Sequence, residues 1–354
     1  MDLVASRKND HLTLTADGDV GFRGVTTLFE CVRLQHDALP ELAEDEIDCT
    51  LQVFGKPLAA PVLVAGMTGG TDEAEQVNLA LARACEARGL ALGLGSQRAM
   101  LKRPESTRSF QVRREAKNVL LFGNLGGIQA AQMSTQEVAD LVGAVEADAL
   151  CIHLNPAMEV VQPEGDRDFR GILATLVRLQ EGLSIPILAK ETGCGISRRT
   201  GRRLVEAGIR HVDVSGAGGT SWVGVETRRA EAVGDARGIR LGNAYWDWGV
   251  PTAASIAMLA PLGFDTLIST GGMTSGLDVA KAVALGATLG GLARPVLQAY
   301  RRGGDAGLGA YLDDIVQELR IAMLLTGSRT LADLRTCDRL IAAPLSLYGA
   351  ESRV

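Results

Sequence analysis

Eight short apolar runs recur along the chain, and each is followed by glycine or by a polar residue. Runs of three to six such residues are typical of parallel strands that are covered on both faces. They are Pro61–Ala65, Leu90–Leu94, Val119–Phe122, Ala149–Ile152, Ile185–Ala189, His211–Val214, Thr266–Ile268 and Ala287–Leu292. The pattern therefore predicts eight buried strands.

Amphipathic stretches with helical spacing lie between these runs, at 73–88, 136–147 and 277–285. Alternation of strands and helices over eight repeats predicts an α/β fold, the closed (β/α)₈ or TIM barrel. An open doubly wound sheet is the alternative, but it generally has fewer strands. We expect a single domain, with residues 1–55 as an N-terminal extension that contributes to the active site and residues 56–354 as the barrel.

Two further segments depart from the repeat. The connection between the sixth and seventh strands, about 215–265, is longer than the others and carries Trp222, Trp246 and Trp248. We expect this excursion to fold over the mouth of the barrel. The last 50 or so residues predict a final helix pair packed on the outside.

Composition changes this picture little. The 354 residues are 46% hydrophobic and 22% charged, which is enough for a large core, and the net charge of −6 offers no basic surface for nucleic acid. The N-terminus lacks an apolar signal segment and no apolar stretch is long enough for a membrane span, so a cytoplasmic protein is expected. The six cysteines form no C-x-x-C pair, and apart from Cys194, which lies in a glycine-rich turn, they predict small buried thiols in a reducing compartment.

Polar residues and glycines follow almost every predicted strand. Active sites of parallel barrels lie at the carboxyl ends of the strands, so these positions are the candidates for chemistry. They comprise Met67, Thr68, Gly69, Ser96, Gln97, Arg98, Asn124, His153, Asn155, Lys190, Ser215, Thr220, Gly271, Gly272, Met273, Ala293 and Arg294. Core positions would instead be apolar.

The last two strand ends predict a phosphate site. Glycines such as Gly271 and Gly272 let backbone N–H groups approach an anion, and the helix start that follows adds a favourable dipole. Barrels often bind phosphate with the loops after strands seven and eight, where Gly271–Met273 and Ala293-Arg294 lie. Turns also need glycine for purely conformational reasons, so the prediction of a phosphate site depends on the position of these residues after the seventh and eighth strands.

Lys190 ends a buried strand and must face the cavity and pair with another group. One role is to stabilise a reduced, anionic flavin, and the other is to form a Schiff base in an aldolase-like barrel. The neighbouring residues do not separate the two.

A second cluster predicts a diphosphate and metal site. His153 and Asn155 point the same way in an extended strand, and Glu159 could hold Mg²⁺, which binds through few carboxylates together with substrate phosphates. Arg7, Lys8 and His11 add three potentially cationic groups ahead of the barrel. A solvated N-terminus and a structural histidine are the alternatives for these two groups.

The segments SRKNDH, MTGG, GLGSQR, GNLG, HLNPAMEVVQPEGDRDF, AKETGCGIS, VSGAGGTSW and STGG resemble type 2 isopentenyl-diphosphate isomerases in sequence and order. This resemblance implies an enzyme that binds FMN and Mg²⁺, uses NADPH as reductant and forms a homo-oligomer, a tetramer or octamer. It converts isopentenyl diphosphate into dimethylallyl diphosphate by a proton shift, with the reduced flavin as acid–base group.

By position, the resemblance implies a site for each ligand. FMN would contact Met67, Thr68, Gly69, Ser96, Asn124, Lys190, Ser215, Thr220, Gly271, Gly272, Met273, Ala293 and Arg294. Substrate would contact Arg7, Lys8, His11, Ser96, Gln97, Arg98, His153 and Asn155, and Glu159 would bind the metal.

The sequence departs from the family pattern at Met158, where a glutamine usually reaches the substrate, and at Thr274, where flavin barrels often have arginine. Gln162, one helical turn further on, is a candidate replacement and, with His153, a candidate catalytic residue. Two alternatives remain open: a binding relative that has altered or lost turnover, and an FMN-dependent hydroxy-acid oxidoreductase. The second would need a base at a late strand end, and no histidine follows residue 211.

Overall fold

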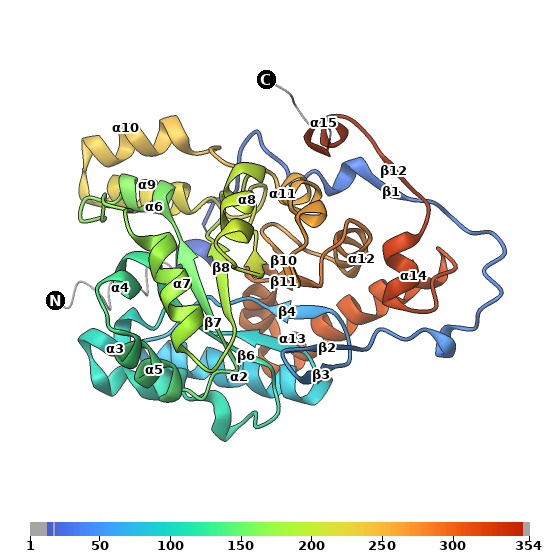
Figure 1. Ribbon diagram of the computed structural model, residues 1–354, viewed down its shortest axis with the longest axis horizontal. Coiled ribbons are helices and arrows are strands. Elements are labelled where there is room, and N and C mark those ends of the chain that lie inside the picture. Colours follow the sequence, from blue (N-terminus) through green and yellow to red (C-terminus); the bar gives the residue numbers. More distant parts are fainter. Residues whose placement is uncertain (1–12, 17, 350–354) are drawn as a thin grey trace.

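The computed structural model describes residues 13–16 and 18–349. Its centre is a closed barrel of parallel strands with helices around it (Figure 1). All eight predicted strands are present, in the order of the chain. They are β4 (Val62–Val64), β5 (Ala91–Gly93), β6 (Leu121–Gly126), β7 (Ala149–Leu154), β8 (Ile187–Glu191), β9 (His211–Asp213), β10 (Thr266–Thr270) and β11 (Leu289–Leu292).

The helices that cover the barrel follow the strands in sequence. The three predicted helices are observed, although the second ends earlier than its apolar pattern suggested. The larger helices are α2 (Asp72–Arg88), α5 (Thr135–Gly143), α7 (Ile172–Gly182), α8 (Arg198–Glu206), α9 (Trp222–Val233), α10 (Ala236–Tyr245), α11 (Thr252–Leu259), α12 (Gly276–Ala284) and α13 (Arg294–Leu324). No helix in the described part of the chain is long and apolar enough to cross a membrane.

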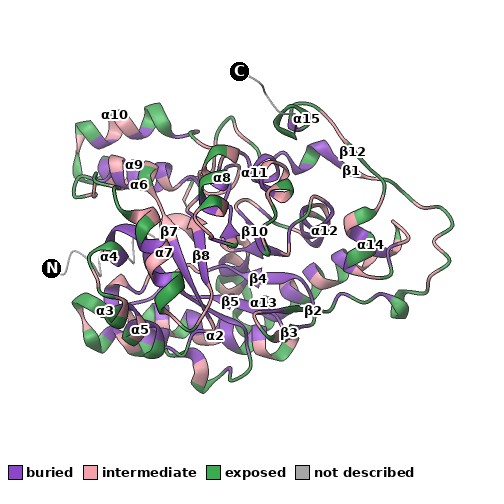
Figure 2. Ribbon diagram, viewed as in Figure 1, coloured by how far each residue is buried: buried purple, intermediate pink, exposed green. Residues whose placement is uncertain are grey.

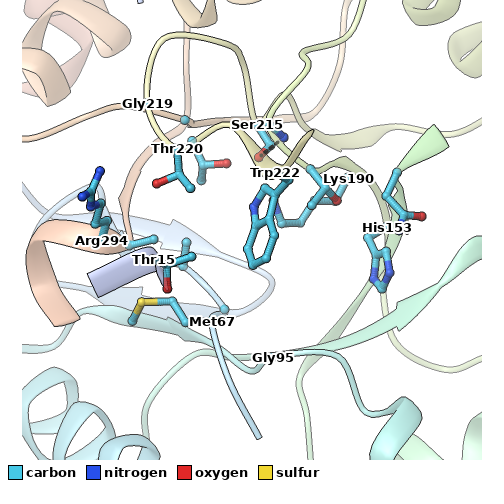
Figure 3. A pocket seen from close by; sticks show the side chains of 18 of the residues that line it. Thr15, Met67, Gly95, His153, Lys190, Ser215, Gly219, Thr220, Trp222 and Arg294 are labelled. Atoms are coloured by element: carbon cyan, nitrogen blue, oxygen red, sulfur yellow. Dashed lines mark hydrogen bonds between the residues drawn. The ribbon is translucent and has the colours of Figure 1, made fainter. Parts of the chain in front are cut away.

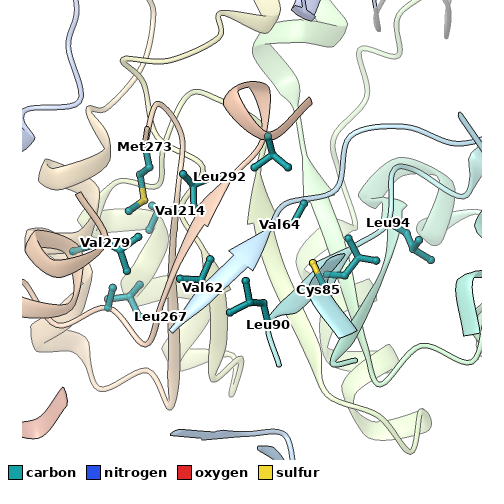
Figure 4. Packing of buried hydrophobic residues seen from close by; sticks show 14 of the residues in the cluster. Val62, Val64, Cys85, Leu90, Leu94, Val214, Leu267, Met273, Val279 and Leu292 are labelled. Atoms are coloured by element: carbon teal, nitrogen blue, oxygen red, sulfur yellow. The ribbon is translucent and has the colours of Figure 1, made fainter. Parts of the chain in front are cut away.

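Burial explains why the strands are continuously apolar. Strands such as β4 and β5 are buried along their whole length, while exposed residues lie on the outer helices (Figure 2). Valine, leucine and isoleucine side chains, among them Val62, Val214 and Leu267, pack between the barrel and its helices (Figure 4). A second, smaller cluster with Leu63, Leu188 and Leu289 fills the barrel interior.

A hairpin closes the amino-terminal end of the barrel. It consists of β2 (Leu51–Val53) and β3 (Lys56–Leu58), whose Val53 and Leu58 belong to the interior cluster. At the turn, the Phe54 ring packs edge-on against His211, the first residue of β9, with ring centroids 4.9 Å apart. This end is therefore sealed by apolar contacts.

The C-terminal region differs from the expected helix pair. α13 runs from Arg294 to Leu324 with a kink at Gly304, and α14 (Leu331–Thr336) follows. The chain then forms β12 (Arg339–Ile341) and the short α15 (Leu345–Gly349). β12 pairs with β1 (Val32–Leu34), so a strand from each end of the chain forms a small antiparallel sheet. Neither β1 nor β12 carries the continuous apolar run that identified the barrel strands, because most of their residues are not buried.

Candidate functional site

A cavity of about 520 Å³ opens at the carboxyl ends of the barrel strands (Figure 3). Most residues that the sequence predicted for the site line it. They are Met67, Thr68, Ser96, Arg98, Asn124, His153, Asn155, Glu159, Gln162, Lys190, Ser215, Thr220, Gly271, Gly272, Met273, Ala293 and Arg294. In the close-up, Arg294 and Thr220 lie on one side, His153 on the other, and Lys190 and Trp222 between them.

Lys190 is held in place by a buried carboxylate. Its ammonium group lies 3.0 Å from an oxygen of Asp213, whose side chain is only 2% exposed. The same ammonium donates to the carbonyl of Glu191 at 3.0 Å. Asp213 also accepts the Thr270 hydroxyl at 2.7 Å and the Ser215 N–H at 3.2 Å. A buried ion pair is favourable only when its remaining polar atoms are satisfied in this way.

Glu191 lies on the other side of the strand from Lys190 and is also buried. Burial raises its pKa to about 8, although the N–H groups of Thr192 and Cys194 that donate to it act in the opposite direction. These bonds tie the turn after β8 to the end of its strand. Thr192 and Gly193 of this turn line the cavity.

Two glycine pairs form one wall of the cavity with very close backbone contacts. A Cβ atom added to Gly219 would lie 2.4 Å from the Cα of Gly272, and one added to Gly272 would lie 2.8 Å from the N of Gly219. Gly271 and Gly272 have φ angles of 106° and 73°, which favour glycine. The Thr252 hydroxyl donates to the Gly271 carbonyl at 2.6 Å and so fixes the turn. Only glycine fits this wall.

Arg294 begins α13 next to this glycine wall. One terminal nitrogen donates to the Gly18 carbonyl at 2.7 Å, while its Nε is buried without a hydrogen-bond partner among the described residues. A helix start with a cationic side chain and glycine-rich turns beside it provides the features of an anion site. The predicted phosphate residues are therefore brought together.

His153 and Asn124 form a second polar side of the cavity. The side-chain oxygen of Asn124 accepts from Nδ1 of His153 at 2.8 Å, while its amide nitrogen donates to the Leu94 carbonyl at 3.1 Å. Because that oxygen can only accept, Nδ1 carries the proton in this arrangement. The pair fixes the imidazole orientation within the cavity.

Asn155 and Glu159 lie on neighbouring turns at the start of α6 (Pro156–Val161). The Asn155 amide donates to one carboxylate oxygen of Glu159 at 2.9 Å, and the Asp166 N–H donates to the other at 3.0 Å. Among the described residues no group of three or more His, Cys, Asp or Glu side chains is placed to hold a metal ion. One carboxylate still fits Mg²⁺, which keeps waters and substrate phosphates as its other ligands.

Some predicted residues are not part of the cavity lining. Gln97 is fully buried: its side-chain oxygen accepts the Asn124 N–H at 3.0 Å and its amide donates to the Leu141 carbonyl at 3.0 Å. Gly69 faces the Phe110 ring instead, because an added Cβ would lie 2.0 Å from that ring. A position at the end of a strand does not by itself reveal whether the residue faces the cavity or the protein interior. Arg7, Lys8 and His11 lie outside the described residues.

The cavity also contains residues that the sequence reasoning did not assign. They include Thr15, Phe22, Gln129, Trp222 and Gln298. Trp222 starts α9 (Trp222–Val233) in the predicted excursion. The tryptophans of that excursion were the sequence signal that it covers the mouth of the barrel. Thr15 and Phe22 come from the N-terminal segment, for which the sequence held no periodic signal.

The excursion fastens this N-terminal segment over the cavity. The Trp246 indole donates to the Gly21 carbonyl at 2.8 Å, and the Arg23 guanidinium lies 3.7 Å from the centre of the Trp246 ring. The Asp247 carboxylate accepts the N–H groups of Arg23 and Gly24 at 2.7 and 2.9 Å. Two parts of the chain that are far apart in sequence thus cover the site together.

The lining fits an FMN cofactor. A flavin needs hydrogen-bonding partners along its ring and a strong anion site for its phosphate. The hydroxyls of Thr68 and Thr192 are buried without a hydrogen-bond partner among the described residues, and both residues line the cavity. Such unpaired buried groups are rare unless a ligand satisfies them. The glycine wall and Arg294 supply the anion site.

Comparison with known proteins agrees with this geometry. A family model described as FMN-dependent dehydrogenase matches residues 172–339. Isopentenyl-diphosphate delta-isomerase of Methanococcoides burtonii is 43% identical over 95% of this chain and 92% of its own length. The protein of that name from Halobacterium salinarum is 43% identical over 95% and 93%, and that from Synechococcus sp. is 44% identical over 94% and 95%.

Solved structures share the fold at low sequence identity. A mandelate oxidase variant with an FMN adduct has a TM-score of 0.66 and 18% identity, with 97% of this chain and 100% of the other covered. A putative lactate oxidase of Pediococcus acidilactici has a TM-score of 0.68 and 17% identity over 96% and 94%. At this low identity the likeness shows the fold alone, whereas the relatives above, at 43% and 44% identity, show the family. The chain belongs to the family of type 2, FMN-dependent isopentenyl-diphosphate delta-isomerases.

Proposed function

We propose that this protein converts isopentenyl diphosphate into dimethylallyl diphosphate with bound reduced FMN and Mg²⁺. One observation carries the proposal: a single cavity combines a glycine-walled anion site and Lys190 with a separate polar cluster around His153 and Asn155. A cavity with two such ends suits two phosphorylated ligands, a cofactor and a substrate. The family membership of the chain supports the same pair.

In this proposal the FMN phosphate binds at the glycine wall and the start of α13. Gly271, Gly272 and Arg294 supply N–H groups and positive charge there, and Thr68, Ser96, Asn124 and Lys190 lie along the path of the ring. Bound reduced FMN supplies the acid–base group for proton exchange with carbon, and NADPH is the reductant that we expect. Lys190 provides the positive charge that favours the reduced ring.

The substrate diphosphate binds at the other end of the cavity. Arg98, His153 and Asn155 would be its partners, and Glu159 would hold the Mg²⁺ that offsets the diphosphate charge. We expect Arg7, Lys8 and His11 to bind the substrate as well. Gln97 supports the site through Asn124, because its side chain is bonded away from the cavity.

The reaction moves a proton between two carbons through a tertiary cation, which water would capture. Trp222, Phe22 and Met158 present largely apolar surface to the cavity and would keep water from the hydrocarbon end of the substrate. Diphosphate anchoring holds that end in a fixed orientation. The protein therefore contributes binding, orientation and exclusion of water.

The test is an anaerobic assay of the full-length protein with FMN, NADPH and Mg²⁺, in which NMR follows the double-bond shift. We expect turnover that depends on all three additions. A protein that binds neither FMN nor the diphosphate would contradict the proposal, and binding without turnover would favour the relative that has lost activity. Consumption of a 2-hydroxy acid without NADPH would instead indicate an oxidoreductase. Size-exclusion chromatography with light scattering tests the expected tetramer or octamer.

A further inference from the structure

Asp213 is a buried charge for which neither ligand proposed above accounts. It is the last residue of β9 and is paired in register with Lys190 of β8. Its carboxylate is 2% exposed and lies within the barrel interior, next to apolar residues such as Cys151 and Ile268 around a small internal cavity. Burying a carboxylate at this place costs free energy that hydrophobic residues would not incur.

The geometry divides the two carboxylate oxygens between two tasks. One oxygen lies 3.0 Å from the Lys190 ammonium, and the other accepts from Thr270 and Ser215 at 2.7 and 3.2 Å. The carboxylate is thereby fixed from β10 and from the loop after β9, and it holds Lys190 from beneath. Lys190 itself lines the large cavity above.

Two charges at 3.0 Å cancel much of each other's field at a distance. A ligand in the cavity therefore experiences a Lys190 cation that is partly compensated from below. A neutral residue at position 213 would leave the cation uncompensated. It would also strengthen the preference of the site for an anionic ligand.

We propose that Asp213 is a positioning residue and counterion that sets how much of the Lys190 charge acts on the flavin, and hence the reduction potential of bound FMN. The inference rests on the proposed function, because it takes FMN as the ligand above Lys190. Reduced flavin carries a negative charge on its ring that the oxidised form lacks. The Lys190–Asp213 pair consequently changes the ratio of the affinity for reduced FMN to the affinity for oxidised FMN.

The experiment compares Asp213→Asn with the wild type, both loaded with FMN, by measuring the midpoint potential and the affinities for oxidised and reduced FMN. Asparagine keeps the shape and an oxygen that accepts from Thr270 and Ser215, but it removes the negative charge. We expect the ratio of reduced to oxidised affinity to rise at least tenfold, which for a two-electron couple is about 30 mV in the positive direction. A purely structural role would weaken both affinities equally and leave the ratio unchanged, which would overturn the proposal.

Two further variants keep the test decisive. Lys190→Met removes the cation, so the ratio is expected to fall below that of the wild type. Thr270→Val keeps both charges but removes a hydrogen bond to Asp213, and this loss concentrates negative charge beside Lys190. We expect a slightly lower ratio of reduced to oxidised FMN affinity. An increase in this ratio would contradict the proposal even if Asp213→Asn did not fold. A wild type that binds no FMN would refute the proposed function itself, whereas FMN binding with an unchanged ratio in Asp213→Asn would refute only the role of Asp213.

Discussion

The two ends of the barrel are built on opposite principles. The amino-terminal end is closed by the β2–β3 hairpin, and Val53 and Leu58 pack into the interior cluster. The carboxyl end opens into a cavity with glycine backbone, a buried ion pair, and buried hydroxyls that have no hydrogen-bond partner among the described residues. Substitutions at the closed end should therefore change stability, and substitutions at the open end should change ligand binding and catalysis.

The largest effect is expected from Gly219→Ala in the glycine wall. The new Cβ would lie 2.4 Å from the Cα of Gly272, and backbone atoms cannot move aside as a side-chain end can. We expect FMN affinity to fall at least a thousandfold, or about 4 kcal/mol. Gly143→Ala is the matched control, since its added Cβ would have no described atom within 4 Å apart from its own helix backbone and chain neighbours. Fluorescence titration with FMN measures both, and normal FMN affinity in Gly219→Ala would contradict the assigned phosphate site.

At the closed end, Leu58→Ala removes a side chain that is 2% exposed. The lost burial and the remaining cavity should lower the free energy of unfolding by about 3 kcal/mol. Denaturant unfolding measures this loss, and an assay well below the unfolding transition should give an unchanged kcat. A large drop in kcat without loss of stability would show that the two ends are not separate.

The raised pKa of Glu191, a residue beside the open end, should make the stability of the folded protein depend on pH. Burial raises its pKa to about 8 in the folded protein, so the folded state keeps a proton that the unfolded state has already released above pH 4.5. Stability is therefore highest at low pH and is lost as the pH rises toward 8, by roughly 2 kcal/mol between pH 6 and pH 8. Glu191→Gln should remove this slope in thermal unfolding measured across that range. An identical slope in both proteins would assign it to other groups.

The smallest effect concerns the amide that the family pattern places at position 158. Met158 and Gln162 both line the cavity, and Gln162 is 4% exposed. If Gln162 supplies the amide, Gln162→Met should lower kcat about tenfold, the equivalent of one hydrogen bond. Met158→Gln alone should change kcat less than threefold and should restore activity in the Gln162→Met background. A large gain from Met158→Gln alone would show that the wild type lacks this contact.

The sequence predicted the barrel well because parallel strands must be apolar on both faces. All eight runs became strands, and residues after them such as Ser96 and Lys190 reached the cavity. It could not predict the direction of Gln97, whose amide is bonded into the protein, or the link between Asp213 and Lys190. Those contacts depend on how neighbouring strands are staggered around the barrel. Thr15 and Phe22 were missed for a similar reason, since tertiary contacts alone bring them to the site.

The sheet of β1 and β12 has a consequence for how the chain is made. Its two strands pair Val32 with Ile341 and Leu34 with Arg339. Beside them, the Cys31 thiol contacts the carbonyl of Ala343, 312 positions further along the chain. During synthesis on a ribosome, β1 emerges before the barrel strands and remains without its partner until β12 has been made. Until then its edge has unpaired N–H and C=O groups that can recruit other chains. Assembly of this region must therefore follow the synthesis of β12, and nascent chains are most exposed to aggregation before it.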